Sequence, residues 1–408
     1  MQIQELFPTL KAVELSVSYP ETVDTPNIVN THFHPRDTDA EGDGRAEMLI
    51  PRAAEVYETL MCMGNTKPPL TTSELAYRKG AQWRALLPAD SSTKIRVGGL
   101  MTEGTDPADV VSGYDQPEGK AAWDYMKMFV RAASNAHGAD VNDISTMIPV
   151  LKAMTYTKFS HRREPMTLAV HMERKYDLFG RRIYFLHRER ASVERDLSRL
   201  FLEVPDAKIV VCHVTDSYTI DVIRYLRSKG YNVWGEVCPH YSLWSCDDLV
   251  EAPDGGTMFA ADKFCLPIFK TEESRQAVDS AMLSDEPYWI YGCDDACWWD
   301  DPTQPGGVKI NNHGFVIGGQ TQSPAANVSY VIERFAETGN LDRLNDFMSI
   351  NAREAYGLDY PKTLKKFVRK DWIVDEYFVR QTPRGEMRAR LAMAGMKRKY
   401  VPAERVIA

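Results

Sequence analysis

Six potential metal ligands of this 408-residue chain lie in short apolar stretches or at the ends of them. His32 and His34 form an H-x-H pair, and alternation along a strand would place both imidazoles on one face. Four imidazoles and a carboxylate suit Zn²⁺ or a similar divalent ion. Each residue alone would fit a structural role, but together they predict a metal site. The six are His32, His34, Lys127, His171, His213 and Asp294.

Lys127 is the unusual member of this set because it lies in the apolar sequence YMKMFV. An apolar flank disfavours a lone ammonium group. Reaction with CO₂ would convert the amine into a carbamate, an anionic ligand that can bridge two cations. A paired metal site stabilises both the attacking and the leaving side of a hydrolysis. We therefore expect two metal ions bridged by a carbamylated Lys127.

The elements that would hold these residues alternate between short β-rich runs and longer amphipathic stretches. Runs rich in Val, Ile and Tyr are typical of parallel strands covered on both faces. Apolar residues recur every three or four positions in 141–154, 190–202, 218–229 and 272–283. The alternation predicts an α/β fold, a (β/α)8 barrel, whose strand ends converge at one mouth; a doubly wound open sheet is the alternative. The expected strands are 27–33, 55–63, 94–101, 125–130, 167–171, 208–214, 232–238 and 288–294.

The sequence predicts three parts: an N-terminal lead at 1–26, a catalytic barrel domain at 27–370 and a C-terminal extension with a basic tail at 371–408. The segment 297–312 contains two prolines and two glycines and is expected to be a loop. Residues 380–408 carry eight Lys or Arg against two acids, and 387–396 is expected to form a short helix. We interpret this tail as a surface extension or a dimer-contact arm, and we expect a homodimer. A nucleic-acid arm is the alternative.

Composition limits the classes of partner. The chain is 44% hydrophobic and 26% charged, as in globular proteins, and its net charge of −8 argues against a broad basic surface for nucleic acid. Apolar runs fall short of the ~18 residues that span a bilayer. The N-terminus lacks the pattern of a secretory signal, and seven scattered cysteines suit a reducing compartment. We therefore expect a cytoplasmic protein with a small-molecule substrate, no nucleic acid and no membrane partner.

Several sequence motifs, taken together and in this order, resemble the dihydroorotases of the amidohydrolase superfamily, most closely the short stand-alone bacterial type. The resemblance covers about residues 27–360 and implies a barrel of the metal-dependent hydrolase type. The motifs are HFHPRD at 32–37, MGNTKPP at 63–69, KMFVRAASNAHGADV from Lys127, TLAVH ending at His171, VVCHVT around His213, EVCPHYSL at 236–243, FCLPIFK at 264–270, GCDDA at 292–296 and INAREAYGL at 350–358.

The resemblance implies a zinc enzyme of pyrimidine biosynthesis that interconverts N-carbamoyl-L-aspartate and L-dihydroorotate. His32, His34 and Asp294 would hold the more buried Zn²⁺, His171 and His213 the other, and carbamylated Lys127 would bridge the two. Arg36 and Asn65 would bind the substrate carboxylate, and the backbone of Leu266 would contact the ring.

Chemistry at such a centre assigns a second role to Asp294. A water molecule bound between two metal ions has a lowered pKa, so near neutral pH it is present as hydroxide, which is a nucleophile. Asp294 would accept its proton and pass it to the leaving amide nitrogen.

Two sequence differences set this chain apart from the family pattern. The family motif D-S-A-P-H here reads DDACW, so Trp298 replaces a histidine that binds the substrate carboxylate. Tryptophan lacks both the charge and the acceptor of histidine. A threonine pair in the loop after Lys127 is replaced by Ser134 and Asn135. We hypothesise that His313 takes over part of the lost carboxylate contact.

Three functions fit these residues. The first is dihydroorotase, which Arg36 and Asn65 favour because they suit an acidic substrate. The second is another cyclic-amide hydrolase, hydantoinase-like or allantoinase-like, for which Trp298 leaves room. The third is a catalytically silent homologue, which the presence of all six candidate ligands disfavours.

Overall fold

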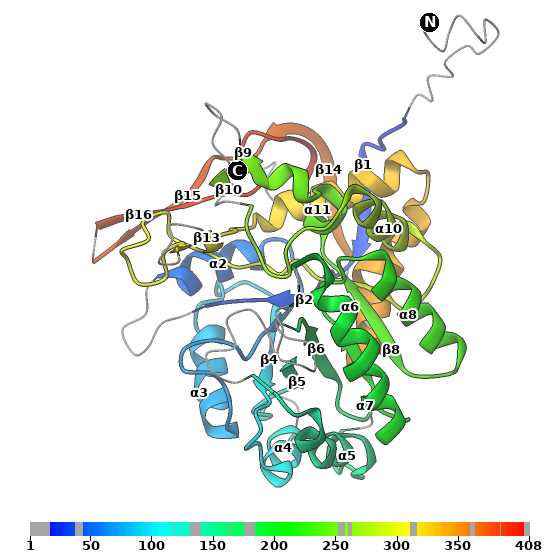
Figure 1. The fold of residues 1–408 in the computed structure, drawn as a ribbon. Helices are drawn as coiled ribbons and strands as arrows, with labels where there is room; N and C mark the ends of the chain where they lie inside the picture. Colours follow the sequence, from blue (N-terminus) through cyan, green and yellow to red (C-terminus); the bar gives the residue numbers. More distant parts are fainter. Residues whose placement is uncertain are drawn as a thin grey trace, which may run out of the picture.

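The computed structural model describes residues 17–36, 44–117, 119–130, 140–162, 164–174, 183, 185–251, 258–259, 263–310, 316–359, 364–383 and 385–403. Eight strands form one sheet in the order β11-β8-β7-β6-β5-β4-β3-β2, and all seven neighbouring pairs are parallel. Seven of these strands lie within segments that the sequence predicted, and β6 extends one residue beyond its predicted segment; Figure 1 shows how the strands are arranged. The strands are β2 (Val29–Phe33), β3 (Thr59–Cys62), β4 (Lys94–Leu100), β5 (Tyr125–Val130), β6 (Leu168–Met172), β7 (Ile209–Val211), β8 (Val233–Val237) and β11 (Trp289–Tyr291).

The barrel closes between its first and last strands, immediately beside the predicted metal ligands. The backbone N–H of His34 donates to the carbonyl of Asp295 at 2.7 Å, and the N–H of Asp295 donates to the carbonyl of His32 at 3.1 Å. Phe33 and Asp295 thereby form a parallel bridge. The Asn30 side chain ties the same seam, since its Nδ2 donates to Asp295 Oδ2 at 2.8 Å. Closure thus brings residues separated by more than 260 positions to one place.

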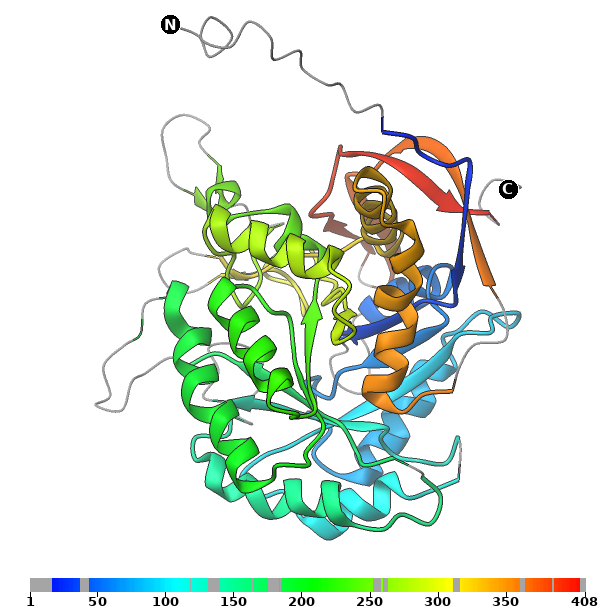
Figure 2. The ribbon, with the colours of Figure 1, turned by 90° about the vertical axis from the view of Figure 1, so that its right-hand side faces the viewer.

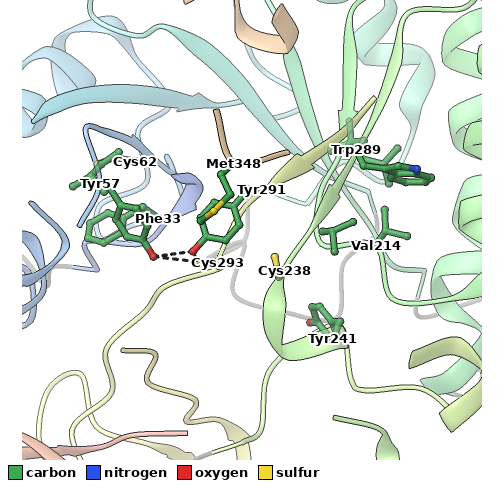
Figure 3. Packing of buried hydrophobic residues seen from close by; sticks show 14 of the residues in the cluster. Phe33, Tyr57, Cys62, Val214, Cys238, Tyr241, Trp289, Tyr291, Cys293 and Met348 are labelled. Atoms are coloured by element: carbon green, nitrogen blue, oxygen red, sulfur yellow. Dashed lines mark hydrogen bonds between the residues drawn. The ribbon is translucent and has the colours of Figure 1, made fainter. Parts of the chain in front are cut away.

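Apolar side chains fill two layers, one inside the barrel and one between the barrel and its helices. The inner cluster contains alternate strand residues such as Tyr125, Ala169 and Val210, as expected for side chains that project alternately to either face. Figure 3 shows part of the outer layer, where the hydroxyl groups of Tyr57 and Tyr291 lie 3.2 Å apart. Both strand faces are therefore buried, which explains why the strands read as continuous apolar runs.

Helices surround the sheet (Figures 1 and 2), and several begin at residues suited to that position. The side chains of Thr72, Asp106, Asp216, Thr271 and Ser323 each accept a backbone N–H from the first turn of the helix that follows. The helices are α2 (Arg45–Ala54), α3 (Ser73–Arg84), α4 (Pro107–Tyr114), α5 (Ile148–Tyr156), α6 (Arg188–Ser192), α7 (Ser198–Glu203), α8 (Ser217–Ser228), α9 (Pro239–Leu243), α10 (Glu272–Leu283), α11 (Pro324–Glu337) and α12 (Asn351–Tyr356). None of these described helices is long and apolar enough to cross a membrane.

The two ends of the described chain meet in a separate antiparallel sheet. Strand β14 (Leu364–Ile373) lies between β1 (Thr22–Pro26) and β17 (Lys397–Pro402), and it crosses the domain boundary expected at 370/371. A hairpin of β15 (Tyr377–Thr382) and β16 (Gly385–Arg390) follows β14. The remaining short strands are β9 (Val250–Glu251), β10 (Met258–Phe259), β12 (Lys309–Ile310) and β13 (Val316–Gly318).

The prediction of a short helix over 387–396 is wrong. Residues up to Arg390 belong to β16, and a turn follows. Met387 and Ala389 are buried whereas their neighbours are exposed, which is the two-residue period of a half-buried strand. Pairing with β15 decides the conformation, because a single apolar segment of this length fits either period.

Candidate metal centre

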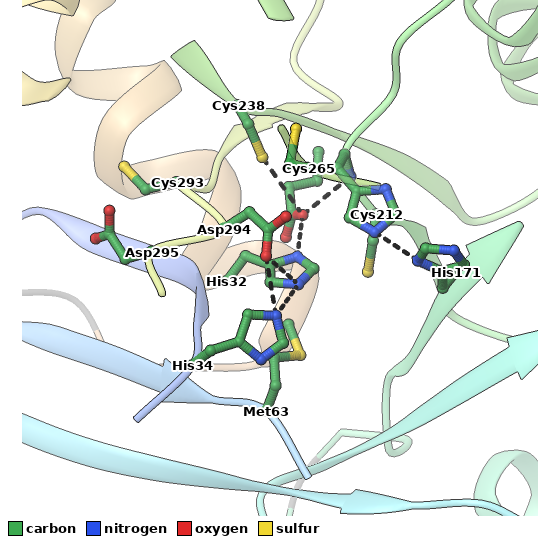
Figure 4. A network of polar contacts seen from close by, with 12 residues as sticks. His32, His34, Met63, His171, Cys212, Cys238, Cys265, Cys293, Asp294 and Asp295 are labelled. Atoms are coloured by element: carbon green, nitrogen blue, oxygen red, sulfur yellow. Dashed lines mark hydrogen bonds and ion pairs between the residues drawn. The ribbon is translucent and has the colours of Figure 1, made fainter. Parts of the chain in front are cut away.

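Three of the predicted ligands meet at the barrel seam. His34 Nε2 lies 2.9 Å from Asp294 Oδ1, and His32 Nε2 lies 3.4 Å from the same oxygen. The two Nε2 atoms are 3.1 Å apart (Figure 4). The donor atoms of all three residues lie within 4.8 Å of one another, a grouping that can hold a metal ion.

The other three predicted ligands come from β5, β6 and the segment after β7. His171 Nδ1 lies 2.8 Å from His213 Nε2. The ring centroids of His32 and His213 are 5.1 Å apart, so both groups of ligands share one mouth. Lys127 is fully buried, and its Nζ lies 2.8 Å from Cys212 Sγ on the neighbouring wall. The fold therefore brings all six predicted ligands together.

The H-x-H pair points inward because strand β2 is irregular. Simple alternation from Val29, which lies in the inner cluster, would turn His32 outward. The register between β2 and β3 shifts between Asn30 and Phe33, and such an irregularity re-aims the side chains that follow it. His32 and His34 consequently both line one small cavity at the mouth of the barrel, the inner cavity.

Glu236 on β8 holds this arrangement in place, and the sequence analysis did not single it out. Its Oε1 lies 2.6 Å from His32 Nδ1 and accepts the backbone N–H of His213 at 3.0 Å. Its Oε2 accepts the Thr31 hydroxyl at 2.7 Å. A Cβ on Gly292 would lie 2.7 Å from this carboxylate, so glycine is needed there. A lone acid within the apolar strand VWGEV was the available signal.

Replacing Glu236 is expected to weaken metal binding. Outer partners of ligating histidines fix ring orientation, and losing one typically costs 10–100-fold in metal affinity. Glu236→Gln should therefore weaken zinc binding by about 10–100-fold, measured by competition with a chelator. Glu164→Gln, which removes an exposed carboxylate with one ion pair, is the control and should bind zinc normally. Equal affinity in both variants would contradict the role of Glu236.

Three residues with a strained backbone conformation lie at the candidate metal centre. Arg36, His213 and Asp294 have φ angles of 28°, 39° and 49°, and they are the only described non-glycine residues with positive φ. Such conformations cost about 1–3 kcal/mol each and persist where the surroundings enforce them. All three residues line the inner cavity, so the strain aims their side chains into it.

The electrostatics of the centre favour metal binding. Burial lowers the pKa of His34 and His213 well below the usual range, which leaves them neutral and able to act as ligands. Burial raises the pKa of Asp294, but the charge of His32 and the hydrogen bond with His34 outweigh this effect and hold that pKa well below its usual range. For His32, burial lowers the pKa and Glu236 raises it, with a net rise to about 9. A metal ion that binds His32 therefore displaces a proton.

The predicted substrate-binding residues also line the inner cavity, with one outside the described part of the chain. Arg36, Asn65 and Leu266 all contribute to its wall, beside the six-ligand cluster. His313, like Ser134 and Asn135, lies outside the described residues. Trp298 lines the cavity as well, and the Arg36 guanidinium lies 4.7 Å from the centroid of its ring.

The residues present fit two divalent ions. Four buried imidazoles, one carboxylate and a buried lysine converge, and the second ring nitrogen of His171 lies 3.2 Å from a carboxylate oxygen of Glu173. A carboxylate behind a histidine is the usual support of a metal-ligating ring. Asp294 is 11% exposed and so remains accessible from the cavity.

Comparison with known proteins identifies relatives over most of the chain. No family model matches the sequence. The chain is 26% identical over 359 residues to the dihydroorotase of Idiomarina loihiensis, covering 87% of this chain and 93% of the relative. A crystal structure of dihydroorotase from Saccharomyces cerevisiae aligns with a TM-score of 0.78 at 20% identity, covering 94% of this chain and 98% of the other.

Hydantoinases share the fold at a greater distance. The L-hydantoinase (dihydropyrimidinase) of Arthrobacter aurescens aligns with a TM-score of 0.69 at 15% identity, covering 93% of this chain and 82% of the other. The sequence relatives, together with the eight-stranded barrel and its ligand cluster, confirm the resemblance found in the motifs. The chain is similar to curated dihydroorotases over most of its length, and it shares the barrel fold of the dihydroorotase and hydantoinase structures.

Proposed function

We propose that this protein is a dihydroorotase, which interconverts N-carbamoyl-L-aspartate and L-dihydroorotate in pyrimidine biosynthesis. The observation that carries the proposal is one cavity wall that combines the ligand cluster with Arg36 and Asn65. The cluster suits cyclic-amide hydrolysis, and the guanidinium suits the carboxylate of an acidic ring. The curated relatives named dihydroorotase support the same reading.

Two Zn²⁺ ions are part of this proposal. His32, His34 and Asp294 would hold one, His171 and His213 the other, and a carbamate on Lys127 would lie between them. Such a pair supplies a polarised ring carbonyl and a water of lowered pKa. The full burial of Lys127 supports carbamylation, since an uncharged amine that reacts with CO₂ avoids burying a lone ammonium.

Asp294 would move the proton in the reaction. Its low pKa keeps it ionised at neutral pH, and its carboxylate reaches the cavity. It would take a proton from the attacking water and return it to the ring nitrogen as the amide bond breaks. Ring closure is the same sequence in reverse.

Arg36 would bind the substrate carboxylate, and its loss is expected to raise KM. Its buried Nε has no hydrogen-bond partner in the described part of the chain, so a ligand can occupy it. A charge-assisted hydrogen bond contributes about 1.5–3 kcal/mol, so Arg36→Gln should raise KM for dihydroorotate about 10–100-fold. Steady-state kinetics measure this, with kcat expected to change less. An unchanged KM would exclude the contact.

A hydantoinase-like activity is the second candidate, because Trp298 stands where the family histidine would bind a carboxylate. The deciding experiment assays the zinc-loaded protein, prepared with bicarbonate, on dihydroorotate, hydantoin and allantoin. Turnover of dihydroorotate supports the first proposal. Turnover of another ring without dihydroorotate would favour the second, and no turnover at two bound metals would favour a silent homologue.

Other expectations extend this proposal. We propose a cytoplasmic homodimer in which the barrel at 27–370 is the catalytic unit, flanked by the lead at 1–26 and the extension at 371–408. His313 remains a predicted contact to the substrate carboxylate. Size-exclusion chromatography with light scattering tests the dimer, and KM for His313→Ala tests the contact.

A further inference from the structure

A larger cavity opens directly beside the inner one. The inner cavity has a free volume of about 40 Å³, whereas the outer cavity measures about 410 Å³. The first volume holds only a few groups the size of water, and the second is in the range of small-molecule sites. Arg36, Asn65 and Trp298 line both cavities, so a ligand at the metal centre can extend into the outer one.

Positive charge lines the outer cavity. Among its described lining residues four are cationic and none is acidic. One of the four is 96% buried: Arg45 is only 4% exposed, and its Nη1 donates to the Cys297 carbonyl at 3.3 Å. The four are Arg36, Arg45, Lys67 and Lys309.

Three of these cations make cation–π contacts with the ring of Trp298. Arg36 Cζ, Lys309 Nζ and Arg45 Cζ lie 4.7, 5.1 and 5.6 Å from the ring centroid. The negative face of an indole attracts cations, which offsets part of their mutual repulsion. The tryptophan that replaces the family histidine therefore holds several positive charges beside the mouth.

The cations repel one another, and burial and this repulsion together lower the pKa of Lys309. Burial, followed by the charges of Arg36, Lys67 and Arg45, lowers the pKa of Lys309 to about 7. A bound anion would relieve this repulsion and favour the charged lysine.

We propose that the outer cavity is a subsite for a doubly charged oxyanion group of the phosphate, sulfate or dicarboxylate class. Arg45, Lys67 and Lys309 bind its oxygens, and the Trp298 ring holds Arg45 and Lys309 beside it. The group is either a second acidic arm of the ring substrate or a separate anion bound beside it. The first source rests on the proposed function, whereas the second is independent of it.

Calorimetric titration of the zinc-loaded full chain with sodium sulfate tests the subsite, at pH 6.5 and against sodium chloride of matched ionic strength. We expect one saturable site per chain, about tenfold weaker in Lys67→Gln and in Lys309→Gln. Lys152→Gln, which removes an exposed lysine on α5, should bind as the unmodified protein does. Circular dichroism verifies that each variant is folded. Absence of saturable binding, or equal binding by all three variants, would overturn the proposal.

A second titration identifies the source of the anion. The ligand is dihydroorotate with a carboxymethyl group on a ring nitrogen, titrated with and without saturating sulfate. Weaker binding in sulfate assigns the subsite to an arm of the ring ligand, and unchanged binding assigns it to a separate anion; both results retain the subsite. Because the readout is binding, failure to hydrolyse dihydroorotate would leave the sulfate result intact.

Discussion

Asp294→Asn is expected to lower kcat for dihydroorotate hydrolysis by about 10³-fold, since a positioned acid–base group contributes about 10²–10⁴-fold. An amide at this position can neither accept the proton of the attacking water nor return it to the leaving nitrogen. It also removes the negative charge beside His34 Nε2 and His32 Nε2, which lie 2.9 and 3.4 Å from Asp294 Oδ1. Steady-state kinetics on zinc-loaded protein measure the loss.

Metal analysis separates the two roles of Asp294. If the variant retains its zinc and still loses about 10³-fold in kcat, proton transfer accounts for the loss. Asp300→Asn, an exposed acid in the following loop, is the matched control and should keep full activity. A variant of Asp294 that keeps both its zinc and its kcat would exclude Asp294 as the acid–base group.

Lys127→Met is expected to have an effect of similar size through the metals. Methionine fills the buried site between Cys212 and Phe129 but cannot react with CO₂, so the proposed anionic bridge could not form. Metal charge stabilisation is worth several kcal/mol, which corresponds to a fall in kcat of about 10³-fold. Zinc content should fall below two ions per chain.

A spectroscopic readout tests the carbamate independently of activity. Protein loaded with zinc in ¹³C-bicarbonate should give a carbamate carbonyl resonance, and Lys127→Met should lack it. Lys152→Met removes an exposed lysine and should retain both the resonance and the zinc. An identical spectrum from Lys127→Met and the unmodified protein would place any carbamate elsewhere.

Much of the site was predictable because parallel strands order it. Lys127 and His171 sit within continuous apolar strands, and parallel pairing of β5 with β6 brings their ends together without further information. The strand pattern also predicted the barrel, since each of the eight strands overlaps an expected segment. Short strands such as β7 and β11 were overestimated in length, because apolar residues continue beyond the last paired position.

Other features depended on contacts distant in sequence. The role of Glu236 arises because closure of the barrel places β8 two strands from β2, so that Glu236 meets His32, 204 residues away in sequence. The positive charge of the outer cavity arises because Arg45 on α2, Lys309 on β12 and Trp298 meet only in the folded chain. The prediction of a helix in the tail was wrong because the apolar residues there fit either period, and only the hairpin pairing of β16 with β15 selects the strand.

The sequence by itself predicted the candidate ligands, their order along the chain and the barrel that carries them, since residue chemistry and strand periodicity are local properties. Only the tertiary structure decided which side chains support the ligands and which charges gather at the mouth. Closure between His34 and Asp295 and the irregularity in β2 set the aim of each group. Those are long-range contacts, whose geometry is fixed by packing of the whole barrel rather than by any neighbouring residue.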